Sequence, residues 1–269
     1  MVSTRITGAS RLVPILAYPV DHVQAPNFYN PIFIKEKLDW IMFPLGIKPN
    51  DFSLTVNQLS KMTNLQGLNI TIPHKNRAFT LCQRLGEEAK RTGVVNTMRL
   101  DPDGHWSGDS FDGIGFVNAA LAHQVLNPER PVLMYGAGGA GTAIAFALAQ
   151  AGINEIRIVN REDEMTLNLI HKLRLAYPNI KCQSGRGHVQ EVGLVVNATS
   201  LGLHSYDELP FQPNELESDT AVFDIIAARE TELMKACQLR GLKVIGGRAM
   251  TDHQIALQIS FWQGKHLGN

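Results

Sequence analysis

The segment Tyr135-Gly136-Ala137-Gly138-Gly139-Ala140-Gly141 gives the clearest indication of the fold. Its glycines at 136, 138 and 141 have the G-x-G-x-x-G spacing, between a predicted strand over 131–135 and a predicted helix over 140–151. In such a loop the first glycine permits a tight turn, the second lets the backbone approach a pyrophosphate, and the third allows close helix–strand packing. The helix N-terminus adds unpaired amides and the positive end of a dipole. A glycine-rich turn without a ligand is the alternative, but the flanking strand and helix favour a dinucleotide site.

Strand and helix patterns alternate on the carboxyl side of this loop, which is typical of a parallel sheet. The N-terminal part is more mixed: it combines predicted strands with helices, a hairpin over 93–107, and a helix over 112–124 that is amphipathic on Ile114, Val117 and Leu121. We therefore expect an α/β protein with two lobes. The change to strict alternation assigns 1–105 to an N-terminal α/β lobe and 106–242 to a Rossmann-type parallel-sheet nucleotide lobe.

Composition excludes several classes of protein. The 269 residues carry 25 Lys+Arg and 25 Asp+Glu, a formal net charge of zero, so neither a nucleic acid nor an anionic membrane surface is an expected partner. Apolar runs such as 143–149 are far shorter than the ~18 residues that span a bilayer. The first residues lack the apolar stretch of a signal peptide, and the three cysteines form no CxxC pair. We expect a cytoplasmic protein, a monomer or a homodimer.

The predicted strand over 155–160 ends in the sequence Asn160-Arg161-Glu162-Asp163. An acid at this distance from the glycine loop binds the ribose 2′-hydroxyl of NAD, whereas an arginine favours the 2′-phosphate of NADP. The chain has both, and Asp163 has the further interpretation of a helix cap. Because a carboxylate repels a 2′-phosphate, we expect NAD to be preferred, with NADP possible.

Two polar clusters precede the nucleotide lobe, at 69–75 (NITIPHK) and at 108–113 (GDSFDG). Asn69 and Thr71 lie on one face of a predicted strand, because side chains alternate with period two. Each polar residue also has an ordinary interpretation when taken alone: Lys75 as a solvated lysine in a first helical turn, Asp112 as a helix N-cap, and Asn96 as a turn residue.

The chain resembles the shikimate dehydrogenase family over nearly its whole length. The resemblance rests on NITIPHK (69–75), GVVNT (93–97), DGIGF (112–116), GAGGAG (136–141), NR (160–161), NATSLG (197–202), GGRAMTDHQ (246–254) and FWQG (261–264). It implies a substrate held between an N-terminal α/β lobe and a Rossmann lobe, with the C-terminal segment 243–269 on the N-terminal lobe. It also implies site residues: Lys75 and Asp112 as the catalytic pair; Asn69, Thr71, Asn96 and Gln254 as substrate contacts; and Gly136, Ala137, Gly138, Gly139, Ala140, Gly141, Asn160, Arg161, Asp163, Thr199 and Gly247 as cofactor contacts.

The implied chemistry is oxidation of a secondary alcohol of a small ring compound. Hydride passes to the nicotinamide, and a lysine at hydrogen-bond distance accepts or donates the hydroxyl proton. Asp112 would orient Lys75 and bind a neighbouring hydroxyl. No metal is expected, since the nine histidines form no HExxH pattern.

The chain departs from the family at the positions that hold the substrate. Val23 and Ala25 replace the two serines that grip the substrate carboxylate, Ser110-Phe111 replaces Asn-Thr, and Ala227 replaces a tyrosine. Gln24 is the local candidate for a replacement donor. Three functions stay open: an NAD(P)-dependent dehydrogenase of shikimate, quinate or a similar ring acid that forms the 3-keto compound; a paralogue that acts on another alicyclic alcohol; and a nucleotide-binding regulatory protein without turnover.

Overall fold

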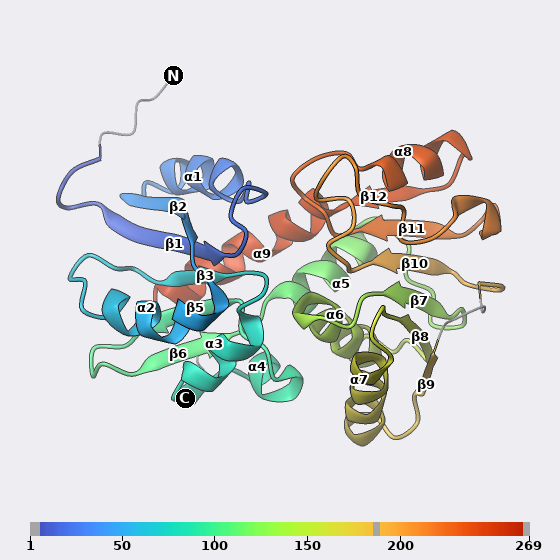
Figure 1. The fold of residues 1–269 in the computed structure, drawn as a ribbon, viewed down its shortest axis with the longest axis horizontal. Helices are drawn as coiled ribbons and strands as arrows, with labels where there is room; N and C mark the ends of the chain where they lie inside the picture. Colours follow the sequence, from blue (N-terminus) through green and yellow to red (C-terminus); the bar gives the residue numbers. More distant parts are fainter. Residues whose placement is uncertain (1–5, 185–188, 266–269) are drawn as a thin grey trace. The chain divides into compact units, whose positions relative to one another are not determined.

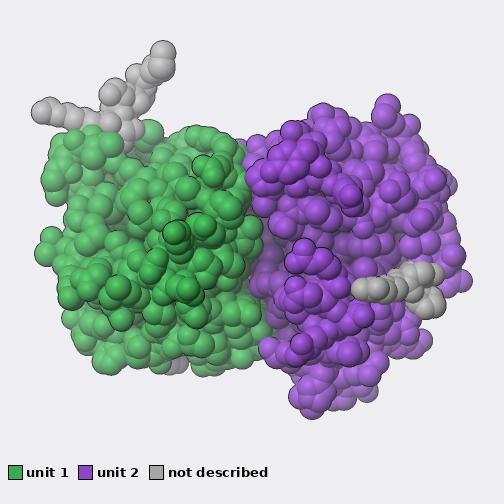
Figure 2. Space-filling model, viewed as in Figure 1, with its two compact units in different colours: residues 1–111, 255–269 green, residues 112–254 purple. Residues whose placement is uncertain are grey.

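The structure is a computed structural model, and it describes residues 6–184 and 189–265. Its chain divides into two compact units, one formed by Met1–Phe111 with Ile255–Asn269 and the other by Asp112–Gln254 (Figure 2). Each unit contains one six-stranded sheet (Figure 1).

The first unit is built on a mixed sheet with the strand order β2-β1-β3-β5-β6-β4. The strands β1, β2 and β3 run parallel, while β5 and β6 form an antiparallel hairpin beside them. In chain order the elements of this unit are β1 (Arg11–Ala17), α1 (Pro26–Lys35), β2 (Trp40–Gly46), η1 (Pro49–Asp51), α2 (Phe52–Leu59), β3 (Leu68–Ile70), α3 (Lys75–Leu81), β4 (Arg84–Leu85), α4 (Glu87–Thr92), β5 (Thr97–Leu100) and β6 (Trp106–Asp109).

Alternating side chains of this sheet enter two separate cores. Val13 and Ile15 of β1 pack with α1 and the last turns of α9 (Gly247–Trp262), whereas Leu16 packs on the other face with α2 and α3. Both faces are therefore covered, and polar groups near the ends of these strands are buried.

The second unit is a fully parallel sheet with the order β12-β11-β10-β7-β8-β9, which is the doubly wound nucleotide-binding arrangement. Its elements are α5 (Asp112–Ala122), β7 (Val132–Tyr135), α6 (Gly139–Gln150), β8 (Glu155–Val159), α7 (Asp163–Ala176), β9 (Lys181–Ser184), β10 (Leu194–Asn197), η2 (Pro213–Glu215), β11 (Ala221–Asp224), α8 (Glu232–Leu239), β12 (Val244–Gly246) and the first half of α9. The strand order reverses between β7 and β10, so the crevice for a ligand opens after these two strands.

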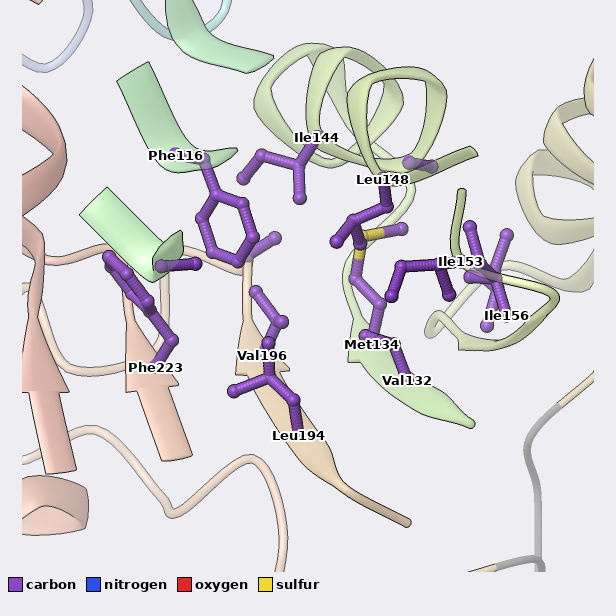
Figure 3. Packing of buried hydrophobic residues seen from close by; sticks show 14 of the residues in the cluster. Phe116, Val132, Met134, Ile144, Leu148, Ile153, Ile156, Leu194, Val196 and Phe223 are labelled. Atoms are coloured by element: carbon purple, nitrogen blue, oxygen red, sulfur yellow. The ribbon is translucent and has the colours of Figure 1, made fainter. Parts of the chain in front are cut away.

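The core of the second unit lies on both faces of this sheet. Val132 and Met134 of β7 point toward α5, α6 and α7, where they meet Phe116 and Ile144 (Figure 3). Leu133, between them, points to the opposite face and packs with residues of α8. This burial on both sides explains why β7 is apolar along its length.

The compact units divide the chain at other positions than those predicted. The prediction ended the first lobe at residue 105, but β6 pairs with β5 and keeps residues up to Phe111 in the first unit. The prediction placed 243–269 on the N-terminal lobe, but β12 pairs with β11, and the chain returns to the first unit only from Ile255. The change to strict alternation of strands and helices in the sequence shows where the pattern of the second unit begins. It does not show which strand is the last to pair in the sheet of the first unit.

The predicted buried face of the helix over 112–124 is wrong. Leu121 is 56% exposed, whereas Gly113, Phe116 and Ala119 are buried. A Cβ atom added to Gly113 would lie 2.4 Å from the carbonyl oxygen of Ala143 on α6. The two helices pack so closely that the contact face is formed by small residues, which an amphipathic pattern does not reveal.

Candidate functional site

The glycine loop joins β7 to α6 at the reversal of strand order. Gly136 has a φ of +108°, and a Cβ atom there would lie 2.5 Å from the carbonyl oxygen of Ala198 after β10. A Cβ atom on Gly141 would lie 2.1 Å from the carbonyl oxygen of Gly136. Both glycines are therefore required by the protein's own backbone packing, as the motif predicts.

Gly138 has a different reason to be glycine. Its backbone is extended, and an added Cβ atom would meet no protein atom within 4 Å. Neither conformation nor packing requires glycine here, so the space beside it suits the close approach of a pyrophosphate. The helix α6 begins at Gly139, and its first amides, those of Gly139 and Ala140 included, point out of the helix end.

The end of β8 is tied to this loop. Asn160 accepts a hydrogen bond from the amide of Ala137 at 3.2 Å and donates to the carbonyl of Glu162 at 3.2 Å. The amide of Ala137 is thus bonded within the protein. The guanidinium of Arg161 is 92% exposed and lies 3.6 Å from the carboxylate of Glu162, and Asp163 is the first residue of α7.

A buried polar network at the ends of β10 and β11 fixes the neighbouring loop. Asn197 accepts hydrogen bonds from the backbone amide and the hydroxyl of Thr199, and donates to Asp224 at 3.0 Å. Asp224 is fully buried, which raises the pKa of its carboxyl, and it also accepts a bond from the Thr231 hydroxyl at 2.6 Å. Of this network only Thr199 is among the residues predicted from the sequence. Its signal was polar residues at the ends of apolar strands.

Lys75 begins α3 and is 8% exposed. This burial rules out the interpretation as a solvated surface lysine, because a lysine is almost never buried unless partners hold it. Its carbonyl accepts the amide of Val95 at 3.1 Å, which joins the start of α3 to the segment before β5. The helix α3 runs only from Lys75 to Leu81, so Lys75 lies in its first turn.

The predicted substrate residues Asn69 and Asn96 lie on the same sheet as each other. Asn69 on β3 is 7% exposed and Asn96, directly before β5, is 3% exposed. The amide of Ile70 donates to the carbonyl of Asn96 at 2.7 Å, which brings the two residues side by side. Thr71 lies directly after β3 and is half-buried, and its backbone amide donates to the carbonyl of Leu16 on β1 at 3.1 Å.

In the second unit Asp112 and Gln254 are brought together. The amide of Gln254 on α9 donates to the carboxylate of Asp112, the first residue of α5, at 3.3 Å. A Cβ atom on Gly115 would lie 2.4 Å from Cγ of Gln254, so this glycine makes room for the glutamine. The carboxylate lies at the start of a helix, where the dipole stabilises its charge.

The departures at Val23, Ala25 and Phe111 belong to one apolar cluster. Phe111 is 4% exposed and makes an edge-to-face contact with Phe261, while Val23 and Ala25 pack against the same cluster. Gln24, the predicted replacement donor, accepts a hydrogen bond from the side chain of Asn27 at 2.7 Å.

Two further predicted positions have clear local explanations. Thr199 accepts the amide of Leu201 at 3.0 Å and so closes a short turn after β10. A Cβ atom on Gly247 would lie 2.1 Å from the carbonyl oxygen of Ile225, so packing alone requires glycine there. Ala227, where the family has tyrosine, is half-buried in the segment after β11.

Within residues 6–184 and 189–265 there is no group of three histidine, cysteine or acidic side chains that could hold a metal ion. Among the same described residues, no helix is long and apolar enough to cross a membrane.

The doubly wound sheet, the glycine loop at its reversal point and the buried lysine define a dinucleotide-binding α/β protein with a polar site on its first unit. Residues 15–98 match the family model of the shikimate dehydrogenase substrate binding domain, and residues 120–236 that of shikimate / quinate 5-dehydrogenase. The shikimate dehydrogenase (NADP+) of Acidiphilium cryptum is 35% identical over 260 residues, 96% of this chain and 92% of that relative. The chain belongs to the shikimate dehydrogenase family, and it is an NAD(P)-dependent oxidoreductase.

Solved structures agree with this assignment. Shikimate dehydrogenase from Aquifex aeolicus aligns with a TM-score of 0.86 and 27% identity over 98% of this chain and 96% of that chain. Shikimate 5-dehydrogenase from Listeria monocytogenes, in complex with shikimate and NAD, gives 0.81 and 27% over 98% and 95%. The 5-ketofructose reductase of Gluconobacter sp. strain CHM43 gives 0.80 and 25% over 97% and 96%. The predicted two-lobe α/β fold and enzyme class are confirmed.

Proposed function

We propose that the protein catalyses the reversible, NAD(P)-dependent oxidation of a ring hydroxyl in shikimate, quinate or a similar polyhydroxylated ring acid, forming the 3-keto compound. The observation that carries this proposal is the buried Lys75 on the unit that also holds the buried amides of Asn69 and Asn96. Amides that bind hydroxyl groups and an amine that exchanges a proton are the groups that this reaction needs.

In this proposal Lys75 holds the proton of the reacting hydroxyl. When the alcohol is oxidised, neutral Nζ accepts the hydroxyl proton, and when the ketone is reduced, the ammonium donates it. Asn69, Thr71 and Asn96 orient the ring, and Asp112 with Gln254 binds a neighbouring hydroxyl. The nicotinamide, when bound, accepts or supplies the hydride.

The glycine loop is the proposed cofactor site. The outward amides at the start of α6 bind the pyrophosphate, and the open space beside Gly138 admits it. NAD is the proposed preference, because three acidic residues, Glu162, Asp163 and Glu164, follow the end of β8. Arg161 is the cation within this run, and it is paired with Glu162. The relative from Acidiphilium cryptum is named for NADP+. Measuring whether this chain prefers NAD or NADP therefore tests the effect proposed for the acidic residues after β8.

A second function is favoured by the apolar cluster at 23, 25 and 111. A substrate carboxylate placed against Val23 and Ala25 would lose water without gaining hydroxyl partners. A polyhydroxylated alcohol or ketone without a carboxylate avoids this cost. The similarity to 5-ketofructose reductase, 25% identical with a TM-score of 0.80, is in line with such a substrate.

The experiment that tests both functions is a panel of substrates with each nucleotide. Shikimate, quinate, the methyl ester of shikimate and carboxylate-free polyols are offered with NAD and NADP, using the parent and Lys75→Met. The parent is expected to turn over at least one ring alcohol, and Lys75→Met to lose about 10²–10⁴ in kcat while nucleotide affinity is unchanged. A parent that binds a nucleotide but oxidises none of these alcohols, or a Lys75→Met enzyme within a few-fold of the parent, would contradict the proposal.

A further inference from the structure

Gln258 lies four residues after Gln254 on α9 and is fully buried in the first unit. Its Oε1 accepts hydrogen bonds from the hydroxyl of Tyr29 and, at 3.4 Å, from the side-chain amide of Asn69. Its Nε2 donates to the hydroxyl oxygen of Thr97 at 2.7 Å. One buried amide therefore reaches α1, β3 and β5 together.

The same network continues to Asn96. The Thr97 hydroxyl donates to Oδ1 of Asn96 at 2.8 Å, and the backbone amide of Phe111 donates to this same oxygen at 3.1 Å. The three residues that these hydrogen bonds link, Gln258, Thr97 and Asn96, are all buried.

The direction of every bond in this network follows from one backbone amide. The N–H of Phe111 can only donate, so the Asn96 atom it meets must be the oxygen. The Thr97 hydroxyl, bonded to that oxygen, must spend its one hydrogen there, so the Gln258 atom beside it must be Nε2. Oε1 of Gln258 is then turned to Asn69, which must present its Nδ2. The backbone amide of Phe111 thus fixes which atom of each side-chain amide is the oxygen and which is the nitrogen.

We propose that Gln258 is a positioning residue that sets the hydrogen-bond polarity of the substrate site. It holds Nδ2 of Asn69 toward itself, so that Oδ1 of Asn69 points away as an acceptor. Through Thr97 it holds Oδ1 of Asn96 inward, so that Asn96 has only Nδ2 hydrogens to offer to a further partner. The inference rests on the proposed function, which assigns both asparagines to the substrate.

This polarity selects the chemistry of the ligand. The group that meets Oδ1 of Asn69 must carry a hydrogen to donate, as a hydroxyl does. A carboxylate has no hydrogen to donate, so it is excluded from that position. The group that meets Asn96 must accept, which a hydroxyl, a carbonyl or a carboxylate can do. The site is thus built to recognise a hydroxyl at Asn69 and to reject the same ring with that hydroxyl replaced by an acceptor alone.

Deoxyfluoro analogues of shikimate test this directly, because fluorine has nearly the size of a hydroxyl but donates no hydrogen bond. In the parent, fluorine at the hydroxyl that meets Asn69 is expected to lower kcat/KM at least about tenfold, the loss of one hydrogen bond. Gln258→Met removes the polarity with little change of volume, and it should reduce that selectivity for hydroxyl over fluorine to about threefold or less. Thr97→Val removes the hydroxyl that orients the amide of Gln258 and should therefore also reduce this selectivity at Asn69.

Gln66→Met is the matched control. The amide of Gln66 donates to the carbonyl of Trp262 at 2.6 Å, in the same unit and near the end of the same helix. Its loss should lower thermal stability without changing selectivity. If Gln258→Met lowers kcat/KM for shikimate and all analogues by one common factor, as a purely structural lesion would, the proposal is wrong.

A panel on which the parent shows no turnover would refute the proposed function without deciding the polarity. The side-chain amide resonances of Asn69 and Asn96 decide it in that case, by 15N NMR of the ligand-free protein. Both should shift in Gln258→Met and neither in Gln66→Met. Resonances of Asn69 and Asn96 that stay in place in Gln258→Met would overturn the inference.

Discussion

Restoring two hydroxyls at positions 23 and 25 should convert the protein into a better shikimate dehydrogenase. Val23 and Ala25 are half-buried beside Phe111 in an apolar cluster, so a carboxylate there is dehydrated without partners. Val23→Ser with Ala25→Ser adds two donors. One hydrogen bond to a charged group contributes about 1.5–3 kcal/mol, a factor of roughly 10–100 in kcat/KM.

We expect the double variant to reach the gain of one such bond and not of two. Phe111 stays in place and keeps part of the site apolar, and the carboxylate has to approach both hydroxyls at once. The assay is the initial rate with shikimate at saturating nucleotide, compared with the methyl ester of shikimate, whose neutral ester group needs no charge-assisted bond. The gain should appear for shikimate and be at most two- to threefold for the ester.

Leu38→Ser is the matched control, because Leu38 also packs against this cluster but lies between α1 and β2. It introduces a hydroxyl and loses apolar contact without supplying a donor at 23 or 25, so it should destabilise the protein and leave shikimate kinetics unchanged. A parent with a low-micromolar KM for shikimate, or a double variant that gains equally on acid and ester, would refute the reasoning. A low-micromolar KM of the parent would mean that Gln24 or a backbone amide already binds the carboxylate, and an equal gain on acid and ester would mean that the new hydroxyls do not bind it.

Three further outcomes are expected. Asp112→Asn should lower kcat/KM by about 10² while the nucleotide Kd, measured by fluorescence titration, stays within twofold; a matching loss of nucleotide affinity would place Asp112 in the cofactor site. The parent should favour NAD over NADP in kcat/KM, and Glu162→Arg should move this ratio toward NADP at least about tenfold by removing one repulsion and adding one cation; a parent that favours NADP tenfold would contradict the assignment at β8. Burial lowers the pKa of His74, whose ring stacks on Phe52 and bonds the Ile47 carbonyl at 2.9 Å. As pH falls below 6.5, His74 therefore becomes protonated in the unfolded chain before it does in the folded protein, and the free energy of unfolding decreases. His74→Phe should flatten that acid-side slope in urea titrations at pH 5–7, and an unchanged slope would show that another group causes it.

The nucleotide-binding unit could be predicted from the sequence because its central strands are buried on both faces. The strands β7, β10 and β11 are apolar runs, and the glycine spacing marks the reversal point. The strand β9 was missed because three of its four residues are exposed and it contains no apolar run. The helix α4 was missed for another reason: the carboxylate of Asp109, twenty residues further along the chain, accepts the amide of Ala89 in its first turn at 2.8 Å. Local sequence does not contain that cap.

The candidate site divides in the same way. Lys75, Asn69 and Asn96 were found through motifs, and the structure adds that all three are buried. Gln258 was missed because its role comes from bonds to α1, β3 and β5, three segments far from it in sequence. A glutamine in a C-terminal helix has no sequence signal of its own. Only the pairing of strands and the return of α9 to the first unit give it partners.

The distribution of the departures shows how this family can change substrate without losing its chemistry. The asparagine network is bonded to buried partners and anchored on a backbone amide, so replacing one member leaves buried polar groups without partners, at about 1–3 kcal/mol each. At positions 23, 25 and 111 the opposite holds, because the side chains there are apolar and pack in one apolar cluster. Substitution is therefore expected to destabilise the protein less at the positions where we propose that the substrate's outer groups are held than at those where we propose that its ring hydroxyls are bound. A chain under selection for a new substrate would be expected to change first at 23, 25 and 111, and to keep Asn69, Asn96 and Lys75, which is the pattern seen in this sequence.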